Sequence, residues 1–139
     1  MRKYENKKRA ALVKEFIRCG ALTRSIETGS TATAFPDVYL CEQIAALIEI
    51  KKDDGAGPAW TRKLTFKDGQ YSFLKRNDEH GGYSFTAVFY ANGVLFSPIS
   101  SIDEKTERPI QGASHLFLNS IEGNGHMILR WLQSFKKGV

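Results

Sequence analysis

Apolar residues alternate with polar ones through the middle of the chain, which is the pattern of strands that bury one face of a sheet. β-Branched and aliphatic residues are frequent in these stretches, and Gly, Pro, Asn or Asp residues lie between most of them. Asn92-Gly93 predicts a two-residue turn between two of the strands. We therefore expect strands at residues 21–26, 38–41, 44–51, 83–90 and 94–99.

Apolar residues recur at helical spacing near both ends of the chain. Residues 4–18 place an apolar stripe on one face and end before Gly20, a common stop for a helix. Residues from about 124 to 137 show a second stripe of this kind. The apolar positions are Leu12, Val13, Phe16 and Ile17 in the first helix, and Met127, Ile128, Trp131, Leu132 and Phe135 in the last.

A further helix is predicted between the strands, over about residues 66–79. Thr65 is the expected N-cap because an acidic residue follows three positions later, and Gly81-Gly82 is the expected end. Gln70 shares the face of two Phe residues, so its amide should point inward. An inward Gln is natural beside a polar site, and a buried Gln satisfied by the backbone is the alternative.

Charged residues occur on a predicted strand that is otherwise apolar. Glu49 and Lys51 point to one face of this strand, and Ile48 and Ile50 point to the other. Two charges on a buried face are costly unless they are paired, solvated or bound to a metal. A hairpin with the preceding strand would bring Asp37 close to Glu49, and two carboxylates together suit a hard cation such as Mg2+.

The charge balance favours a polyanionic partner, since the net charge is +5 and the pI is near 9.3. A soluble protein that is simply basic is the alternative. Residues 1–139 are expected to form a single domain. Cys19 and Cys41 are too few for a disulfide framework or a zinc site and indicate reduced thiols. With no apolar run of membrane-spanning length, we expect a cytoplasmic protein, in the host cytoplasm if the source is viral.

Several short polar stretches are candidates for contact with phosphates. The loop at residues 27–34 is small and hydroxyl-rich, and a plain flexible connection is its alternative interpretation. Trp60 lies beside two cations, which suits a sugar-phosphate backbone, although Trp60 could equally cover the edge of the core. The candidate contacts are Thr28, Ser30, Lys52, Arg62 and Lys63, together with Lys7 and Lys8 in a basic cluster at the first helix.

Pro36-Asp37 followed by Glu49-Ile50-Lys51 resembles the motif of the PD-(D/E)xK nucleases. Within that superfamily the chain is similar to the small Holliday junction resolvases of archaea and phages, over about residues 3–100. The resemblance rests also on Glu5, Thr28-Gly29-Ser30, Gln70 and Gly81-Gly82. It implies an α/β, restriction-endonuclease-like core with a central mixed sheet flanked by helices in the order αβββαβ. Residues 100–139 add nothing recognisable.

The resemblance also implies a metal-dependent endonuclease that hydrolyses phosphodiesters of DNA, with the four-way junction as the expected substrate. Asp37, Glu49, Glu5 and the carbonyl of Ile50 would hold Mg2+, with Mn2+ as a substitute. Lys51 would orient the attacking water or stabilise the transition state, and Gln70 would position water or phosphate. Symmetric cutting of a junction implies a homodimer.

Some features depart from the resolvase pattern and leave alternatives open. Such resolvases have their helical acid one turn later than Glu5, where this chain has Arg9, and Glu15 is a second candidate. Other endonucleases on the same core, of flap, nicking or restriction type, fit the motif as well. From other classes, we consider a nucleic-acid-binding protein without catalysis, an inactivated nuclease, and an interaction domain that exposes Glu49 and Lys51.

Overall fold

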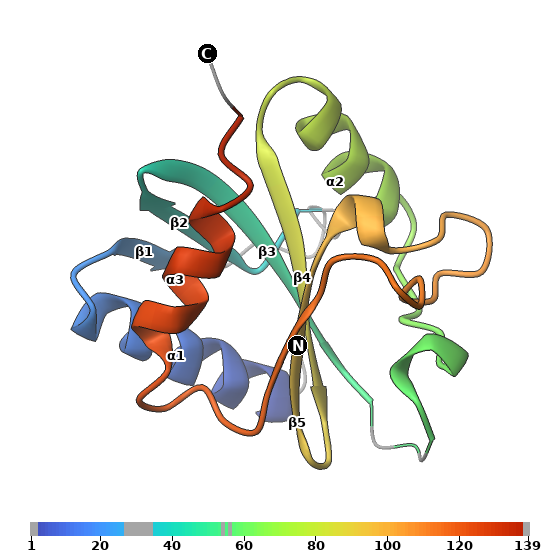
Figure 1. The fold of residues 1–139 in the computed structure, drawn as a ribbon, viewed down its shortest axis with the longest axis horizontal. Helices are drawn as coiled ribbons and strands as arrows, with labels where there is room; N and C mark the ends of the chain where they lie inside the picture. Colours follow the sequence, from blue (N-terminus) through green and yellow to red (C-terminus); the bar gives the residue numbers. More distant parts are fainter. Residues whose placement is uncertain (1–2, 27–34, 54, 56, 138–139) are drawn as a thin grey trace.

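The computed structural model describes residues 3–26, 35–53, 55 and 57–137, with residues 3–6 described in their backbone alone. The described residues form three helices and six strands, with two short 3-10 turns, η1 and η2 (Figure 1). In chain order these elements are α1 (Lys3–Arg18), β1 (Leu22–Ser25), β2 (Val38–Glu42), β3 (Ile44–Lys52), η1 (Ala59–Thr61), α2 (Gln70–Glu79), β4 (Tyr83–Tyr90), β5 (Gly93–Pro98), η2 (Ile99–Ser101), β6 (Leu116–Leu118) and α3 (Gly125–Gln133).

The strands form one mixed sheet in the order β1-β2-β3-β4-β5-β6. Four of the neighbouring pairs are antiparallel, and β3 and β4 are parallel. A parallel pair needs a crossover connection, and α2 supplies it between β3 and β4 (Figure 1). The expected mixed sheet flanked by helices is therefore confirmed.

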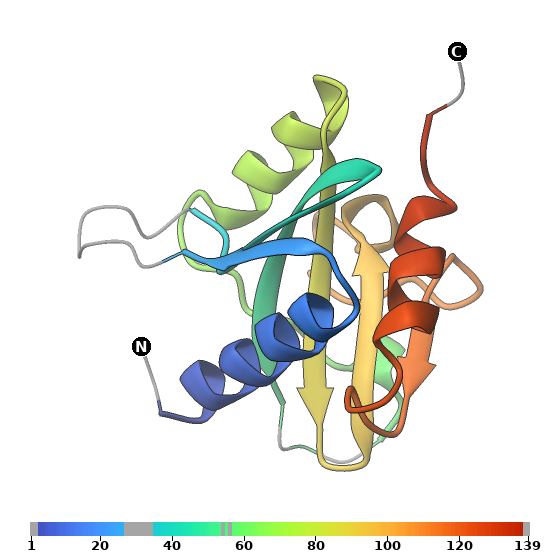
Figure 2. The same ribbon diagram turned by 90° about the vertical axis from the view of Figure 1, so that its left-hand side faces the viewer.

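The helices cover both faces of this sheet (Figure 2). Leu12 and Phe16 of α1 pack with Ile128 and Leu132 of α3 in a core that includes the apolar side chains at even-numbered positions of β3. A smaller apolar cluster on the other face joins Leu74 of α2 to Leu64, Val88, Ile99 and Ile102. None of the described helices is long and apolar enough to cross a membrane.

The middle helix begins later than the sequence predicts. Thr65 was the expected N-cap, but its φ is 59°, outside the range of an N-cap, and the helix begins at Gln70 after Gly69, whose φ is 83°. Glycine takes this left-handed conformation without steric penalty, so the chain turns sharply just before the helix. The predicted N-cap is wrong, and Phe66 does not share a helical face with Gln70.

Three smaller differences concern the second half of the chain. The turn between β4 and β5 consists of Ala91 and Asn92, because Gly93 already pairs with Tyr90. The three-residue strand β6 was not predicted, since its length gives too little alternation to detect. The last helix, α3, is shorter at both ends than the predicted range of 124–137.

Candidate active site

The hairpin of β2 and β3 brings the two acids of the PD…EIK motif together. Val38 pairs with Ile48, and one residue earlier the N–H of Asp37 donates to the carbonyl of Ile48 at 3.2 Å. The carboxylate of Asp37 also contacts β3, accepting a hydrogen bond from the Ile50 N–H at 2.8 Å.

Glu49 and Lys51 lie on the face of the sheet that α2 covers. They are 4% and 7% exposed, so the interpretation of this strand as a surface strand of an interaction domain is wrong. Lys51 Nζ lies 3.5 Å from Glu49 Oε2. The strand alternation that predicts their common face also places them beneath the first residue of α2.

Gln70, the first residue of α2, connects these two charged side chains. Its amide nitrogen donates to Glu49 Oε2 at 3.0 Å, and its amide oxygen accepts from Lys51 Nζ at 2.8 Å. The same oxygen accepts from the Lys67 N–H at 2.8 Å, which fixes the orientation of the amide. Gln70 is 5% exposed and points inward although the helix begins four residues later than predicted.

Three neighbours of Lys51 and Gln70 were not predicted as parts of the site. The carbonyl of Thr65 accepts from Lys51 Nζ at 3.2 Å, and Nζ lies 5.3 Å from the centre of the Phe66 ring. The N–H of Lys67 holds Gln70. Two of these contacts use backbone atoms, which sequence patterns do not identify, and the third depends on the turn at residues 65–69.

The electrostatics of the cluster make Glu49 hard to ionise. Burial and, after it, the negative charge of Asp37 raise the pKa of its carboxyl, and Lys51 offsets this only in part, so the pKa lies at about 8. Two acids close together with insufficient positive charge form a site that a cation would stabilise. The arrangement therefore suits a divalent cation.

The donor atoms near this pair also fit a hard cation. In a strand, the N–H and C=O of one residue point to the same edge, so the Ile50 carbonyl faces the side where Asp37 lies. Carboxylate and carbonyl oxygens are the ligands that Mg2+ prefers. Among the described residues no group of three or more His, Cys, Asp or Glu side chains could hold a metal, and the side chain of Glu5 lies outside the described residues.

Glu15, the alternative acid on α1, is engaged at another place. Its carboxylate accepts from the Gly125 N–H at 2.9 Å, at the start of α3, and pairs with Arg18 at 2.5 Å. The hydrogen bond from Arg18 and the N–H groups at the start of α3 lower the pKa of Glu15 to about 2. Glu15 therefore joins α1 to the start of α3.

Three of the predicted phosphate contacts, Lys52, Arg62 and Lys63, lie at the end of β3 and in the segment that follows it. Lys52 is exposed at the end of β3, directly after Lys51. Arg62 donates to both carboxylate oxygens of Asp53 at 2.6 Å, and Lys63 is 60% exposed and 3.7 Å from Glu107. Thr28 and Ser30 lie outside the described residues.

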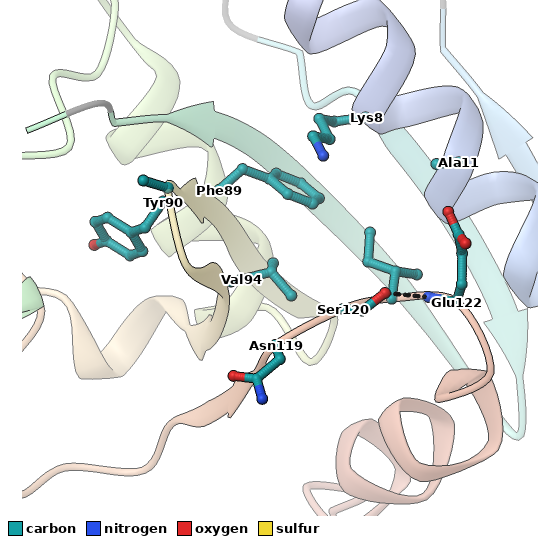
Figure 3. A pocket seen from close by; sticks show the side chains of 11 residues that line it. Lys8, Ala11, Phe89, Tyr90, Val94, Asn119, Ser120 and Glu122 are labelled. Carbon is teal, nitrogen blue, oxygen red and sulfur yellow. Dashed lines mark hydrogen bonds between the residues drawn. The ribbon is translucent and has the colours of Figure 1, made fainter.

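Lys7 and Lys8 lie on α1, and Lys8 is on the other side of the sheet from Glu49. Lys8 lines a hollow of about 160 Å³ between α1 and the turn of β4 and β5 (Figure 3). Its ammonium lies 5.4 Å from the centre of the Phe89 ring. Phe89 belongs to the core under α1, so Lys8 is across the sheet from Glu49, and Lys7 is exposed.

Comparison with known proteins finds a solved structure of similar fold. No protein-family model matches the sequence, and no curated protein matches it either. Among solved structures, that of Archaeoglobus fulgidus Hjc, a Holliday junction resolvase from an archaeal hyperthermophile, matches with a TM-score of 0.54. The match has 13% sequence identity and covers 78% of this chain and 84% of that chain. The chain therefore has the α/β, restriction-endonuclease-like fold that was expected from its sequence.

Proposed function

We propose that the protein is a divalent-metal-dependent DNA endonuclease. The observation that carries this proposal is the cluster in which the half-buried acid Asp37 and the buried acid Glu49 meet the buried ammonium of Lys51 and the buried amide of Gln70. A fold without catalysis gains nothing from such a set, because burying charge lowers stability. The excess of positive charge on the chain agrees with a nucleic-acid substrate.

Each residue of the set has a distinct role in this proposal. Asp37, Glu49 and the Ile50 carbonyl would hold the cation, Mg2+ or its substitute Mn2+, and Glu5 would complete its ligand set. Bound there, the cation would supply Lewis-acid chemistry, polarising the phosphate and lowering the pKa of the attacking water. Lys51 places its ammonium where negative charge develops on the phosphate. Gln70 keeps Lys51 and Glu49 at fixed positions before the substrate arrives.

The substrate we propose is a four-way DNA junction. The fold is shared with a protein described as a Holliday junction resolvase, and this chain is of similar size to it. Cutting two strands of a junction symmetrically requires two active sites, so we propose a homodimer in DNA recombination or repair. Flap, nicking and restriction-type endonucleases on the same core are the alternatives within the class.

Cleavage of labelled DNA separates these possibilities. A synthetic four-way junction and a linear duplex of the same sequence are incubated with the protein and Mg2+, with Glu49→Gln as the inactive control. Paired symmetric nicks on the junction alone would support a resolvase. Cutting of the linear duplex as well would keep the metal site and change the substrate class. Tight junction binding without any cutting would favour a binding protein and contradict the proposal.

A further inference from the structure

Thr86 of β4 is the residue paired with Glu49 across the parallel strands β3 and β4. Its side chain lies on the α2 face, since Val88, two residues along, belongs to the apolar cluster there. Thr86 is fully buried, and its hydroxyl has no hydrogen-bond partner among the described residues. A buried hydroxyl without a partner is unfavourable, so the position calls for an explanation.

The polar neighbours of Thr86 on this face are engaged elsewhere, with one exception. Ser97, its partner on β5, is hydrogen-bonded to His115 Nδ1 at 2.7 Å. Ser84, two residues before Thr86, accepts from the Asn77 amide at 2.9 Å. The remaining polar neighbour across the strands is Glu49.

Glu49 has room for a further donor. Gln70 donates a hydrogen bond to its Oε2 and Lys51 forms an ion pair with the same oxygen. A carboxylate accepts about four hydrogen bonds in total. Thr and Val have the same shape and both favour strands, so packing alone would be served equally well by Val. The hydroxyl is the feature that distinguishes Thr86 from an apolar residue at this position.

We infer that Thr86 is a positioning residue for the cation-bound protein: its hydroxyl, which has no partner among the described residues, donates to the Glu49 carboxylate when the divalent cation is bound and holds that carboxylate in place. This inference rests on the proposed function, because it assumes that Glu49 is a ligand. Thr86 itself touches neither the cation nor the DNA. Its role is to restrict the rotation of Glu49, which reaches the site from the neighbouring strand.

The test compares Thr86→Val, which keeps the shape and removes the hydroxyl, with Thr86→Ser, which keeps the hydroxyl. Two quantities are measured: the unfolding midpoint in urea without cations, and the affinity for Mn2+ by titration calorimetry. Val should leave the midpoint unchanged or raise it, because an unpartnered hydroxyl is removed. Val should weaken Mn2+ binding about tenfold or more, and Ser should restore most of it.

Thr23→Val is the matched control, since Thr23 is a buried threonine on β1 of the same sheet. It should leave Mn2+ binding unchanged. Equal Mn2+ affinity of Thr86→Val and the wild type would overturn the inference, and so would a large loss of stability without cations. If the wild type binds Mn2+ and cleaves DNA while Thr86→Val binds Mn2+ equally well, the inference alone fails. If the wild type binds no Mn2+, the proposed function fails and the inference falls with it.

Discussion

The carboxylate of Asp37 accepts a hydrogen bond from the backbone N–H of Ile50 at 2.8 Å. One acid of the motif is thereby fixed to the strand that carries the other acid. This hydrogen bond gives Asp37 a structural role beyond the chemistry of the acid.

The first prediction separates this structural role from the chemical one. Asp37→Ala removes the acceptor of the Ile50 N–H and should lower the free energy of unfolding by about 1–2 kcal/mol. Asp37→Asn keeps an acceptor oxygen and should be close to the wild type in stability while it loses cation binding. Urea unfolding and Mn2+ titration of both variants check this. Equal stability of the two variants would show that the hydrogen bond contributes nothing.

The second prediction concerns pH. The pKa of Glu49 is raised from 4.5 to about 8 by burial and by Asp37, so the folded protein holds a proton that the unfolded chain releases in this interval. The stability of the cation-free protein should therefore be highest below pH 4.5 as far as Glu49 is concerned. It should fall as the pH rises toward about 8, by at most about 1.4 kcal/mol per pH unit.

Glu49→Gln checks this pH dependence. The variant cannot lose the proton, so its stability should vary less between pH 5 and pH 8 than that of the wild type. Addition of Ca2+ should stabilise the wild type more at pH 8 than at pH 5, because the cation competes with the proton for the carboxylate. Identical pH profiles for the two proteins would contradict the environment assigned to Glu49.

The third prediction concerns Gln70. Gln70→Leu removes the amide that holds both Lys51 and Glu49 and leaves buried polar groups without one partner each. We expect a loss of about 1–3 kcal/mol in stability. In single-turnover cleavage the rate constant should fall while the affinity for DNA changes little, because Gln70 is itself buried. Weakened DNA binding at an unchanged cleavage rate would instead make Gln70 a substrate contact.

The fourth prediction decides between the two acids of α1. Glu15→Ala removes the acceptor at the start of α3 and should destabilise the protein by about 1–2 kcal/mol, with cleavage unchanged where the protein is folded. Because its pKa is lowered to about 2, Glu15 contributes stability above pH 4.5 that is lost as the pH falls toward 2. Glu5→Gln should have the opposite effect, with little change in stability and a loss of cleavage. Loss of cleavage by folded Glu15→Ala would reverse this assignment.

The fifth prediction concerns the contact with DNA. Lys63 is 60% exposed and its pairing with Glu107 at 3.7 Å is weak, so its ammonium is free to exchange that partner for a phosphate. Lys63→Ala should weaken junction binding and reduce the dependence of log affinity on log salt by about one unit. Lys14→Ala, an exposed lysine of α1, is the control and should leave the salt dependence unchanged. An unchanged salt dependence in Lys63→Ala would remove Lys63 from the interface.

The sequence predicts the motif hairpin well because strand alternation is a local property. Glu49 and Lys51 must share a face whatever the rest of the chain does, and Asp37 must approach Glu49 once the hairpin forms. The inward position of Gln70 is predicted correctly, although Phe66, one of the two Phe residues used for that prediction, lies outside the helix. Gly69 in a left-handed conformation displaces the start of the helix, and a capping motif in the sequence gives no information about it.

Contacts between distant parts of the chain could not be predicted in the same way. Glu15 meets Gly125 across 110 residues, and only the packing of α1 against α3 brings them together. Thr86 lies opposite Glu49 because β4 is parallel to β3, and a sequence pattern gives neither the neighbour nor the register. Side-chain partners of this kind require the assembled sheet.

The rate of junction cleavage as a function of Mg2+ concentration, compared between the wild type and Asp37→Asn at a pH of about 8, tests the central claim most directly. The proposed site predicts saturable dependence on Mg2+, no cutting in chelator, and a rate reduced at least about a hundredfold in Asp37→Asn. Cutting that persists in chelator, or equal rates for the two proteins, would contradict it.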